Sequence, residues 1–171
     1  MRHARRTATM ITALVLASGA QQALHAETSS EKELATALGA AKVTLEQGLA
    51  AASKSGRPIS AKFELEKGKL QLSVYTEKGG SFSEVIVDHV TGKIAKSEKI
   101  TEGDDYKDAT AQAEATKGAK VSLQAATGRA VKANSGYRAV SVMPSRKDGK
   151  ASADIVLMKG EDRKVVAESL Q

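Results

Sequence analysis

Residues 59–74 alternate between apolar and polar side chains, which is the pattern of two half-buried β-strands with one face in water. The apolar positions are Ile59, Ala61, Phe63, Leu65, Leu70, Leu72 and Val74. Lys67-Gly68 interrupts the alternation and supplies a tight turn, because glycine adopts positive φ angles without penalty. The pattern predicts an antiparallel hairpin whose apolar positions belong to a core.

Two more strands are expected after this hairpin. Residues 82–89 form a third apolar run, and Ile94 begins a fourth after a turn at Thr91 and Gly92.

The C-terminal part repeats the strand pattern with one strand fewer. Apolar residues around Val140 and Ile155 and the segment 164–167 predict three strands. The last strand has no successor, so it is expected to lie at a sheet edge, with Val165 or Val166 facing the core.

A helix is expected before each group of strands. Thr44 and Gln47 have the spacing of a capping box, in which each side chain bonds to the other residue's backbone N–H. Ser122 takes the cap position in the second group. The apolar stripes at helical spacing are Leu45, Leu49 and Ala52 in the first group and Leu123, Ala126 and Ala130 in the second.

An internal repeat organises these elements. "AKVTLEQ" at residues 41–47 recurs as "AKVSLQA" at residues 119–125, and similar turns follow each copy in the same order. The sequence therefore predicts an α+β fold of two tandem repeats, each with one helix packed on a three- to four-stranded antiparallel sheet.

The repeats divide the chain into segments. Residues 41–98 form the first repeat and residues 118–171 the second, diverged one. Residues 27–40 are a polar, alanine-rich lead expected to contain an extra helix. Residues 99–117 are expected to form an acidic linker that passes into a short helical lead.

Residues 1–26 have the features of a secretory signal peptide. A basic start is followed by the short apolar stretch 10–17, and Leu24 and Ala26 suit the −3 and −1 positions of a cleavage site. The apolar stretch is too short to span a bilayer, and the chain has no cysteine for a lipid anchor or a disulfide. We expect a periplasmic or secreted protein that is not inserted in a membrane after cleavage.

The charge balance argues against nucleic acid as a partner. Loss of Arg2, Arg5 and Arg6 with the signal peptide takes three charges from the formal net charge of +6 and leaves +3. The chain has no Trp, two Phe and three Tyr, which leaves few aromatic rings for base stacking. A mixed surface of this kind is ordinary for a soluble protein.

No motif of a known catalytic class is present. G-x-S-x-G, H-E-x-x-H and phosphate-binding glycine loops are all absent, and His89 is the only histidine after residue 26. We therefore expect no enzyme activity, no catalytic residue and no cofactor.

Four carboxylates close together in the sequence are a candidate cation site. Glu102, Asp104, Asp105 and Asp108 surround Gly103, and carboxylate oxygens suit hard cations such as calcium or a lanthanide. Their spacing differs from that of an EF-hand. The alternative is a solvated linker between the repeats.

The turn after the third strand has a distinct composition. Asp88 can accept backbone N–H groups further along the turn, Thr91 can do so more weakly, and Gly92 suits positive φ. Turn chemistry therefore accounts for these residues, and His89 next to Asp88 is expected to have no catalytic role.

The capped helix "VTLEQGLAAA", the alternating strands and the hairpin "VIVDHVTGKI" resemble the PepSY domain. The D-x-x-T-G ending of that family's third strand is matched by Asp88, Thr91 and Gly92, and the resemblance covers residues 41–97. Residues 119–168 match only in the order of elements and turns. The PepSY domain occurs in propeptides of thermolysin-type metallopeptidases and in many exported bacterial proteins.

The resemblance implies a helix packed on an antiparallel sheet and a non-catalytic role, often inhibition or regulation of a peptidase. The partner would then be an exported peptidase or another protein of the cell envelope. The alternative function is a periplasmic metal-ion-binding protein that holds calcium or a lanthanide with carboxylate oxygens.

The signal peptide generates the first prediction. We expect the exported protein to begin at Glu27, because Ala26 ends the cleavage site. Intact mass spectrometry of the exported form measures this start, and retention of residues 1–26 would contradict the expected localisation.

Overall fold

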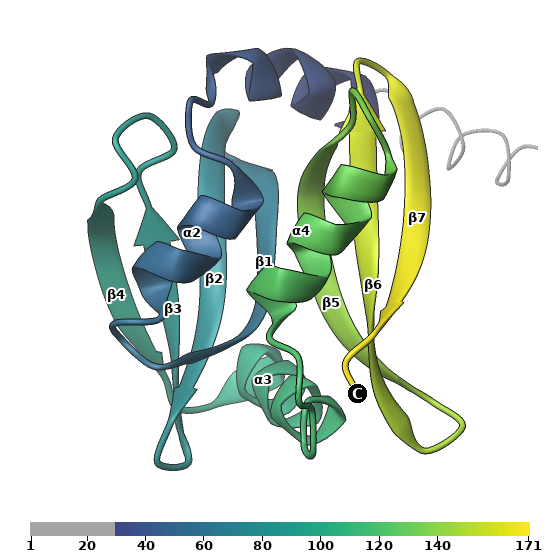
Figure 1. The fold of residues 1–171 in the computed structure, drawn as a ribbon. Coiled ribbons are helices and arrows are strands. Elements are labelled where there is room, and N and C mark those ends of the chain that lie inside the picture. Colours follow the sequence, from purple (N-terminus) through teal and green to yellow (C-terminus); the bar gives the residue numbers. More distant parts are fainter. Residues whose placement is uncertain (1–29) are drawn as a thin grey trace, which may run out of the picture.

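Seven strands form one antiparallel sheet in the computed structural model of the protein, in which residues 30–171 are described (Figure 1). The strands are β1 (Arg57–Glu66), β2 (Lys69–Lys78), β3 (Ser81–Val87), β4 (Ile94–Ile100), β5 (Arg138–Lys147), β6 (Lys150–Lys159) and β7 (Asp162–Ser169). Their order across the sheet is β4-β3-β2-β1-β5-β6-β7, so β4 and β7 are the two edges.

Helices precede and separate the strands. Residues 30–37 are helical and continue into a short 3-10 helix, η1 (Leu38–Ala40). The α-helices that follow are α2 (Leu45–Ala52), α3 (Gly103–Ala115) and α4 (Leu123–Ala133). The expected capping box closes the start of α2: Thr44 N–H donates to Gln47 Oε1 at 2.9 Å, and Gln47 N–H to Thr44 Oγ1 at 3.3 Å. Ser122 Oγ caps α4 by accepting the N–H of Ala125.

Two-residue turns set the register of two hairpins. Lys67 and Gly68 between β1 and β2 have φ angles of 52° and 74°, and Asp148 and Gly149 between β5 and β6 have 50° and 74°. Positive φ at both central residues matches the right-handed twist of the flanking strands. Next to these turns the register is continuous, from Ser60 to Glu66 in β1 and from Ser141 to Lys147 in β5.

The centre of the sheet is the pairing of β1 with β5. Ala61 lies opposite Val142 and Lys62 opposite Ser141. This pairing joins the strands that follow α2 to the strands that follow α4, so the chain has one continuous sheet.

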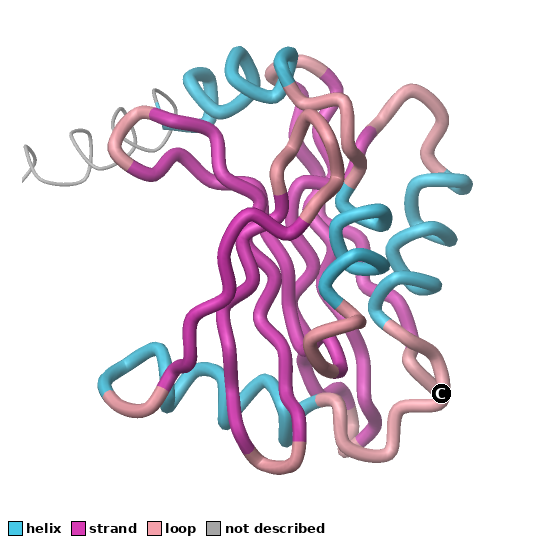
Figure 2. The backbone as a smooth tube through the Cα atoms, turned by 90° about the vertical axis from the view of Figure 1, so that its left-hand side faces the viewer, coloured by secondary structure: helices cyan, strands magenta, loops and turns pink. Residues whose placement is uncertain are grey.

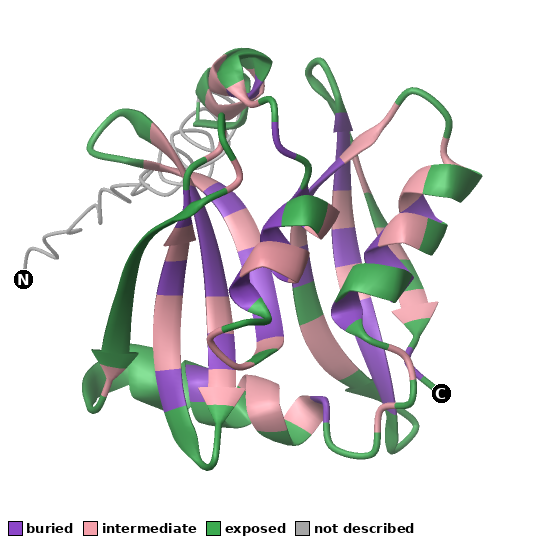
Figure 3. Ribbon diagram, turned by 60° about the vertical axis from the view of Figure 1, so that its left-hand side comes forward, coloured by how far each residue is buried: buried purple, intermediate pink, exposed green. Residues whose placement is uncertain are grey.

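The main core lies between the sheet and the helices α2 and α4, which lie side by side on one face (Figure 1). Helix α2 approaches the sheet closely at Gly48, where an added Cβ atom would lie 2.6 Å from Leu72 Cδ2. Purple bands on the strands in Figure 3 mark the buried positions. The largest fully buried side chains are Leu45, Leu49, Ile59, Leu72, Ile155, Leu157, Leu170, Val74, Val85, Val87, Val142 and Thr76.

Helix α3 covers one end of the opposite face (Figure 2). Ala109 of α3 packs with Ile59 and Phe82 in a second, smaller core. Ser60 Oγ also donates to Gln112 Oε1 of α3 at 2.6 Å. Helix α3 therefore packs on the starts of β1 and β3, on the face of the sheet opposite to α2 and α4.

The α+β fold and its antiparallel strands agree with the sequence pattern. Phe63, Leu72 and Val74 are buried as expected, whereas Leu65 is half-buried beside the turn that closes the β1–β2 hairpin. The expected lead helix is present over residues 30–37, and the expected signal peptide lies outside the described residues.

The acidic linker expected at the start of residues 99–117 is absent, whereas the short helical lead expected after it is part of a helix. Strand β4 continues to Ile100, and the acidic run forms the start of the thirteen-residue helix α3. Two acidic residues in the first turn favour this helix, because they interact with the positive end of its dipole.

Leu72 generates a prediction about stability. Its side chain is fully buried beneath α2, so Leu72→Asp would place an unpaired charge in the core. We expect a loss of about 4 kcal/mol or more in the free energy of unfolding, measured by urea denaturation. The control Leu72→Met conserves volume and should cost less than about 1.5 kcal/mol. Equal stability of Leu72→Asp and the wild type would show that this side chain faces solvent.

Candidate functional site

The turn between β3 and β4 is built around the Asp88 side chain. Its Oδ1 accepts the backbone N–H groups of Val90 at 2.9 Å and Thr91 at 2.8 Å. Gly92, with φ of 73°, returns its N–H to the Asp88 carbonyl, and the Asp88 N–H donates to the Lys93 carbonyl. The structure thus brings Asp88, Thr91 and Gly92 together in one hydrogen-bonded turn.

These bonds favour the ionised carboxylate. The N–H groups of Thr91 and then Val90 lower the pKa of Asp88, since they stabilise its negative charge. The carboxylate is therefore engaged by the backbone of its own turn.

His89 links this turn to the start of α2. Its carbonyl accepts the N–H groups of Lys42 at 2.9 Å and Val43 at 3.0 Å. Its imidazole Nδ1 is buried and has no hydrogen-bond partner among the described residues. The residue thus ties the end of β3 to the segment that leads into α2.

A matching contact ties the end of β7 to the segment that leads into α4. The Leu170 carbonyl accepts the N–H groups of Lys120 at 2.7 Å and Val121 at 3.1 Å. The two helices are therefore anchored to the sheet in the same way.

Two arginines connect these lead segments to the sheet. Arg57 at the start of β1 donates to Thr116 Oγ1 at 2.5 Å, six residues before the cap of α4. Arg138 at the start of β5 donates to the Leu38 carbonyl at 2.8 Å, six residues before the cap of α2. Each arginine thus contacts the lead of the helix that belongs to the other group of strands.

The four carboxylates of the candidate cation site do not converge. Glu102 is the residue before α3, Asp104 pairs with Lys107 at 2.8 Å, and Asp105 and Asp108 follow along the same helix. Within residues 30–171, no group of three or more His, Cys, Asp or Glu side chains is arranged to hold a metal ion. The acidic run instead forms the exposed first turns of α3.

The middle of β7 is an uncovered strand edge. Near the start of the strand, Arg163 pairs with Glu31 of the N-terminal helix at 3.2 Å. At the end of the strand, Arg129 of α4 donates to the Ser169 carbonyl at 2.6 Å. Between these contacts lie Val165, which is 53% exposed, and Val166, which packs against the core.

The direction of the β7 backbone groups follows from one bond. The Leu170 N–H donates to the Ala151 carbonyl, which continues the β6–β7 register, and such bonds recur at every second residue of an antiparallel pair. Val166 therefore turns its backbone groups towards β6, and Val165 and Ala167 turn theirs outward. The outward Ser169 carbonyl that Arg129 reaches agrees with this alternation.

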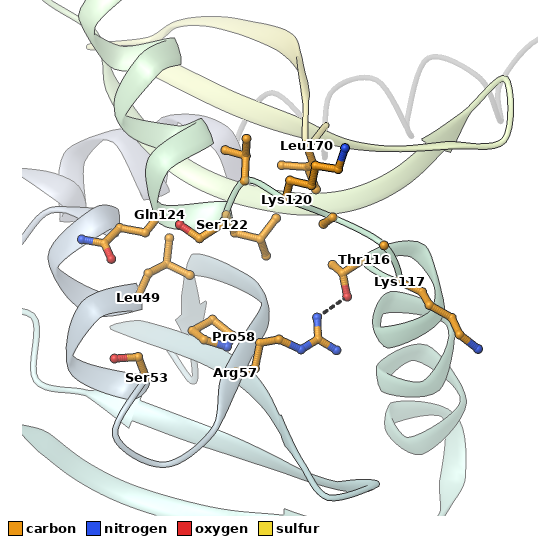
Figure 4. A pocket seen from close by; sticks show the side chains of 14 residues that line it. Leu49, Ser53, Arg57, Pro58, Thr116, Lys117, Lys120, Ser122, Gln124 and Leu170 are labelled. Atoms are coloured by element: carbon orange, nitrogen blue, oxygen red, sulfur yellow. Dashed lines mark hydrogen bonds between the residues drawn. The ribbon is translucent and has the colours of Figure 1, made fainter.

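A cavity of about 550 Å³ lies between α2, the first turn of α4 and the end of the chain (Figure 4). Its lining includes Leu49, Arg57, Lys120 and Leu170. The sequence analysis missed it, because the lining residues come from three separate stretches, 49–58, 116–124 and 170, and share no local motif.

Comparisons with protein-family models, with curated proteins and with solved structures give no match. Within residues 30–171, none of the helices has the length and apolar character that crossing a bilayer requires.

The Asp88 turn generates a prediction about pH dependence. Because its folded-state pKa is lowered, the carboxylate stabilises the fold at neutral pH, and this contribution is lost as the pH falls through that pKa. We expect Asp88→Asn to melt at a lower temperature than the wild type at pH 7. The difference should shrink as the pH falls below about 3.9, the usual aspartate value. A difference that stays constant between pH 7 and pH 2 would show that the charge has no role.

Proposed function

We propose that this protein is an exported, non-catalytic PepSY-type protein that binds an extended segment of a peptidase or another envelope protein at the β7 edge. The observation that carries the proposal is that the middle of β7 has no neighbouring strand on its outer side. Strand β3, which we regard as the counterpart of β7, is paired with β4 on that side.

The equivalence of the two groups of strands is supported by features that recur 81 residues apart. Both hairpin turns have a positive-φ residue before glycine, at Lys67 and Asp148. Both first strands have an irregularity at matching places, between Pro58 and Ser60 and between Ala139 and Ser141. The starts of α2 and α4 are only 78 residues apart. The difference from 81 equals the three extra residues of α4, which has eleven residues where α2 has eight.

The central pairing has the symmetry expected of two joined copies. Ala61 and Val142 are themselves 81 residues apart and lie opposite each other. A twofold axis through this pair exchanges β1 with β5, and Arg57 with Arg138. The contacts of these two arginines with the opposite helix leads follow the same exchange.

This equivalence makes β4 a template for a bound strand. Strand β4 runs antiparallel along β3, and β3 corresponds to β7 at the same offset. The outward residues Val165 and Ala167 of β7 correspond to Glu84 and Ile86 of β3, which lie opposite Glu98 and Lys96 of β4. A partner strand added to β7 would therefore run antiparallel to it.

The other edge is protected against such pairing. Strand β4 carries Lys96, Glu98 and Lys99, and charged residues, lysine above all, discourage strand addition. The uncovered part of β7 carries Val165, Val166 and Ala167 in a row between Lys164 and Glu168. Addition of a strand gives affinity through main-chain hydrogen bonds and suits an extended segment of a partner.

The choice of a peptidase as the partner rests on the PepSY resemblance and on export. The Asp88–Gly92 turn and the capped α2 are the elements that carry this resemblance, and both have the geometry that their residues require. The proposal assigns no catalytic residue and no cofactor.

The proposal predicts that Val165→Pro abolishes peptidase inhibition while the fold persists. Proline removes the outward N–H of residue 165, and an edge strand tolerates this loss because no bond to β6 is broken. We expect the wild-type protein to inhibit casein cleavage by a cell-envelope extract of the producing organism. Val165→Pro should need at least about tenfold more protein for the same inhibition.

Val165→Thr is the matched control, since it keeps the backbone N–H and a β-branched side chain. It should inhibit like the wild type, and the melting temperatures of all three proteins should be similar. Equal inhibition by the two variants would exclude the β7 edge as the binding surface. Lack of inhibition by the wild-type protein would overturn the peptidase assignment.

A further inference from the structure

The cavity beside Leu49 has the size and the surface of a small-molecule site. Its volume of about 550 Å³ falls within the range of roughly 300–1,000 Å³ that is typical of ligand pockets. Much of its wall is apolar, formed by Leu49, Pro58, Ala119, Val121, Leu123 and Leu170. These residues come from α2, β1, the α3–α4 connection, the start of α4 and the C-terminal end, and Figure 4 labels Leu49, Pro58 and Leu170 among them.

The polar part of the wall favours a negative charge. Arg57, Lys117 and Lys120 are basic, and no lining residue is acidic. Lys117 pairs with Glu114 at 3.7 Å, and Arg57 pairs with Glu77 at 3.3 Å. Lys120 is exposed and forms no ion pair within residues 30–171, so its charge is available to a ligand.

Helix α4 adds to this positive character at the same wall. Its first residues Leu123 and Gln124 line the cavity, and their N–H groups have no acceptor within the helix. Ser122 Oγ satisfies only the N–H of Ala125. The start of the helix therefore contributes a partial positive charge and two donors next to Lys120.

The corresponding joint on the other side of the molecule is filled by the chain itself. There Arg138 donates to the carbonyls of Leu38 and Val43 and lies 5.3 Å from the centre of the Phe63 ring. The side chains of Leu38 and Val43 are 3% and 6% exposed. The two carbonyl oxygens thus accept the hydrogen bonds of Arg138, and the Leu38, Val43 and Phe63 side chains fill the space around it.

The side chains at the corresponding positions beside the cavity are smaller. The residue that corresponds to Leu38 is Thr116, which is smaller and offers Arg57 a single hydroxyl. Phe63 corresponds to Pro144, which is also smaller. This comparison uses the proposed equivalence of the two halves, whereas the size, apolar wall and charge of the cavity stand without it.

We propose that the cavity binds an organic anion that consists of a carboxylate and an apolar chain of medium length. The carboxylate lies by Lys120 and the start of α4, where it accepts charge-assisted hydrogen bonds. The apolar chain lies along Leu49, Pro58 and Leu170. The site is separate from the β7 edge.

Isothermal titration calorimetry with octanoate tests this assignment, with octanol and octylammonium as probes of equal chain length and acetate as the carboxylate alone. We expect saturable binding of octanoate at one site per chain. Octanol and octylammonium should bind at least about tenfold more weakly, since neither offers an anionic acceptor. Equal binding of octanol or octylammonium, or no saturable binding of octanoate, would overturn the proposal.

Lys120→Gln and Lys42→Gln form a matched pair of variants. Lys42 precedes α2 as Lys120 precedes α4, it is exposed, and it lies outside the cavity lining. Lys120→Gln should weaken octanoate binding about tenfold, and Lys42→Gln should leave it unchanged. Equal affinities of the two variants for octanoate would show that the carboxylate does not bind at Lys120.

Val165→Pro separates this proposal from the proposed function. It should bind octanoate like the wild type, because the β7 edge does not line the cavity. Loss of octanoate binding in this variant would show that the two sites are not separate. Shifts of the Leu49 and Leu170 methyl signals in NMR spectra should accompany the octanoate titration, and unchanged signals would place the ligand elsewhere.

Discussion

The pairing of β1 with β5 is the contact on which the rest of the structure depends. Neither the strands after α2 nor the strands after α4 form a sheet large enough to cover both helices alone. Ala61 and Val142 meet at the centre, and these small side chains leave room for α2 and α4 to pack together above them. The result is one core under both helices, so each half buries apolar surface of the other.

Two further contacts follow from this central pairing. Arg57 and Arg138 each start a central strand and each reach the lead of the opposite helix. These bonds therefore add to the β1–β5 pairing as contacts between the two groups of strands. The two sides differ in their surroundings, since Arg138 lies against the Phe63 ring and Arg57 lines a cavity.

Local patterns predicted the local structure well. The capping box at Thr44, the Lys67-Gly68 turn and the Asp88 turn depend on neighbouring residues, so their sequence determines their geometry. The acidic run was predicted to be a linker because the contacts that hold α3 on the sheet, such as Ala109 against Ile59 and Gln112 with Ser60, come from distant strands. The single continuous sheet and the cavity depend on contacts between distant segments, which periodicity does not encode.

The unequal edges of the sheet have a consequence for stoichiometry. A sheet with two open edges can add chains at both sides and grow into fibres, whereas here β4 closes one side with charged residues. Under the proposed function, strand addition is therefore confined to the β7 side of the sheet. Two molecules that met through their β7 strands would leave only β4 edges outside, so self-association of this kind stops at the dimer.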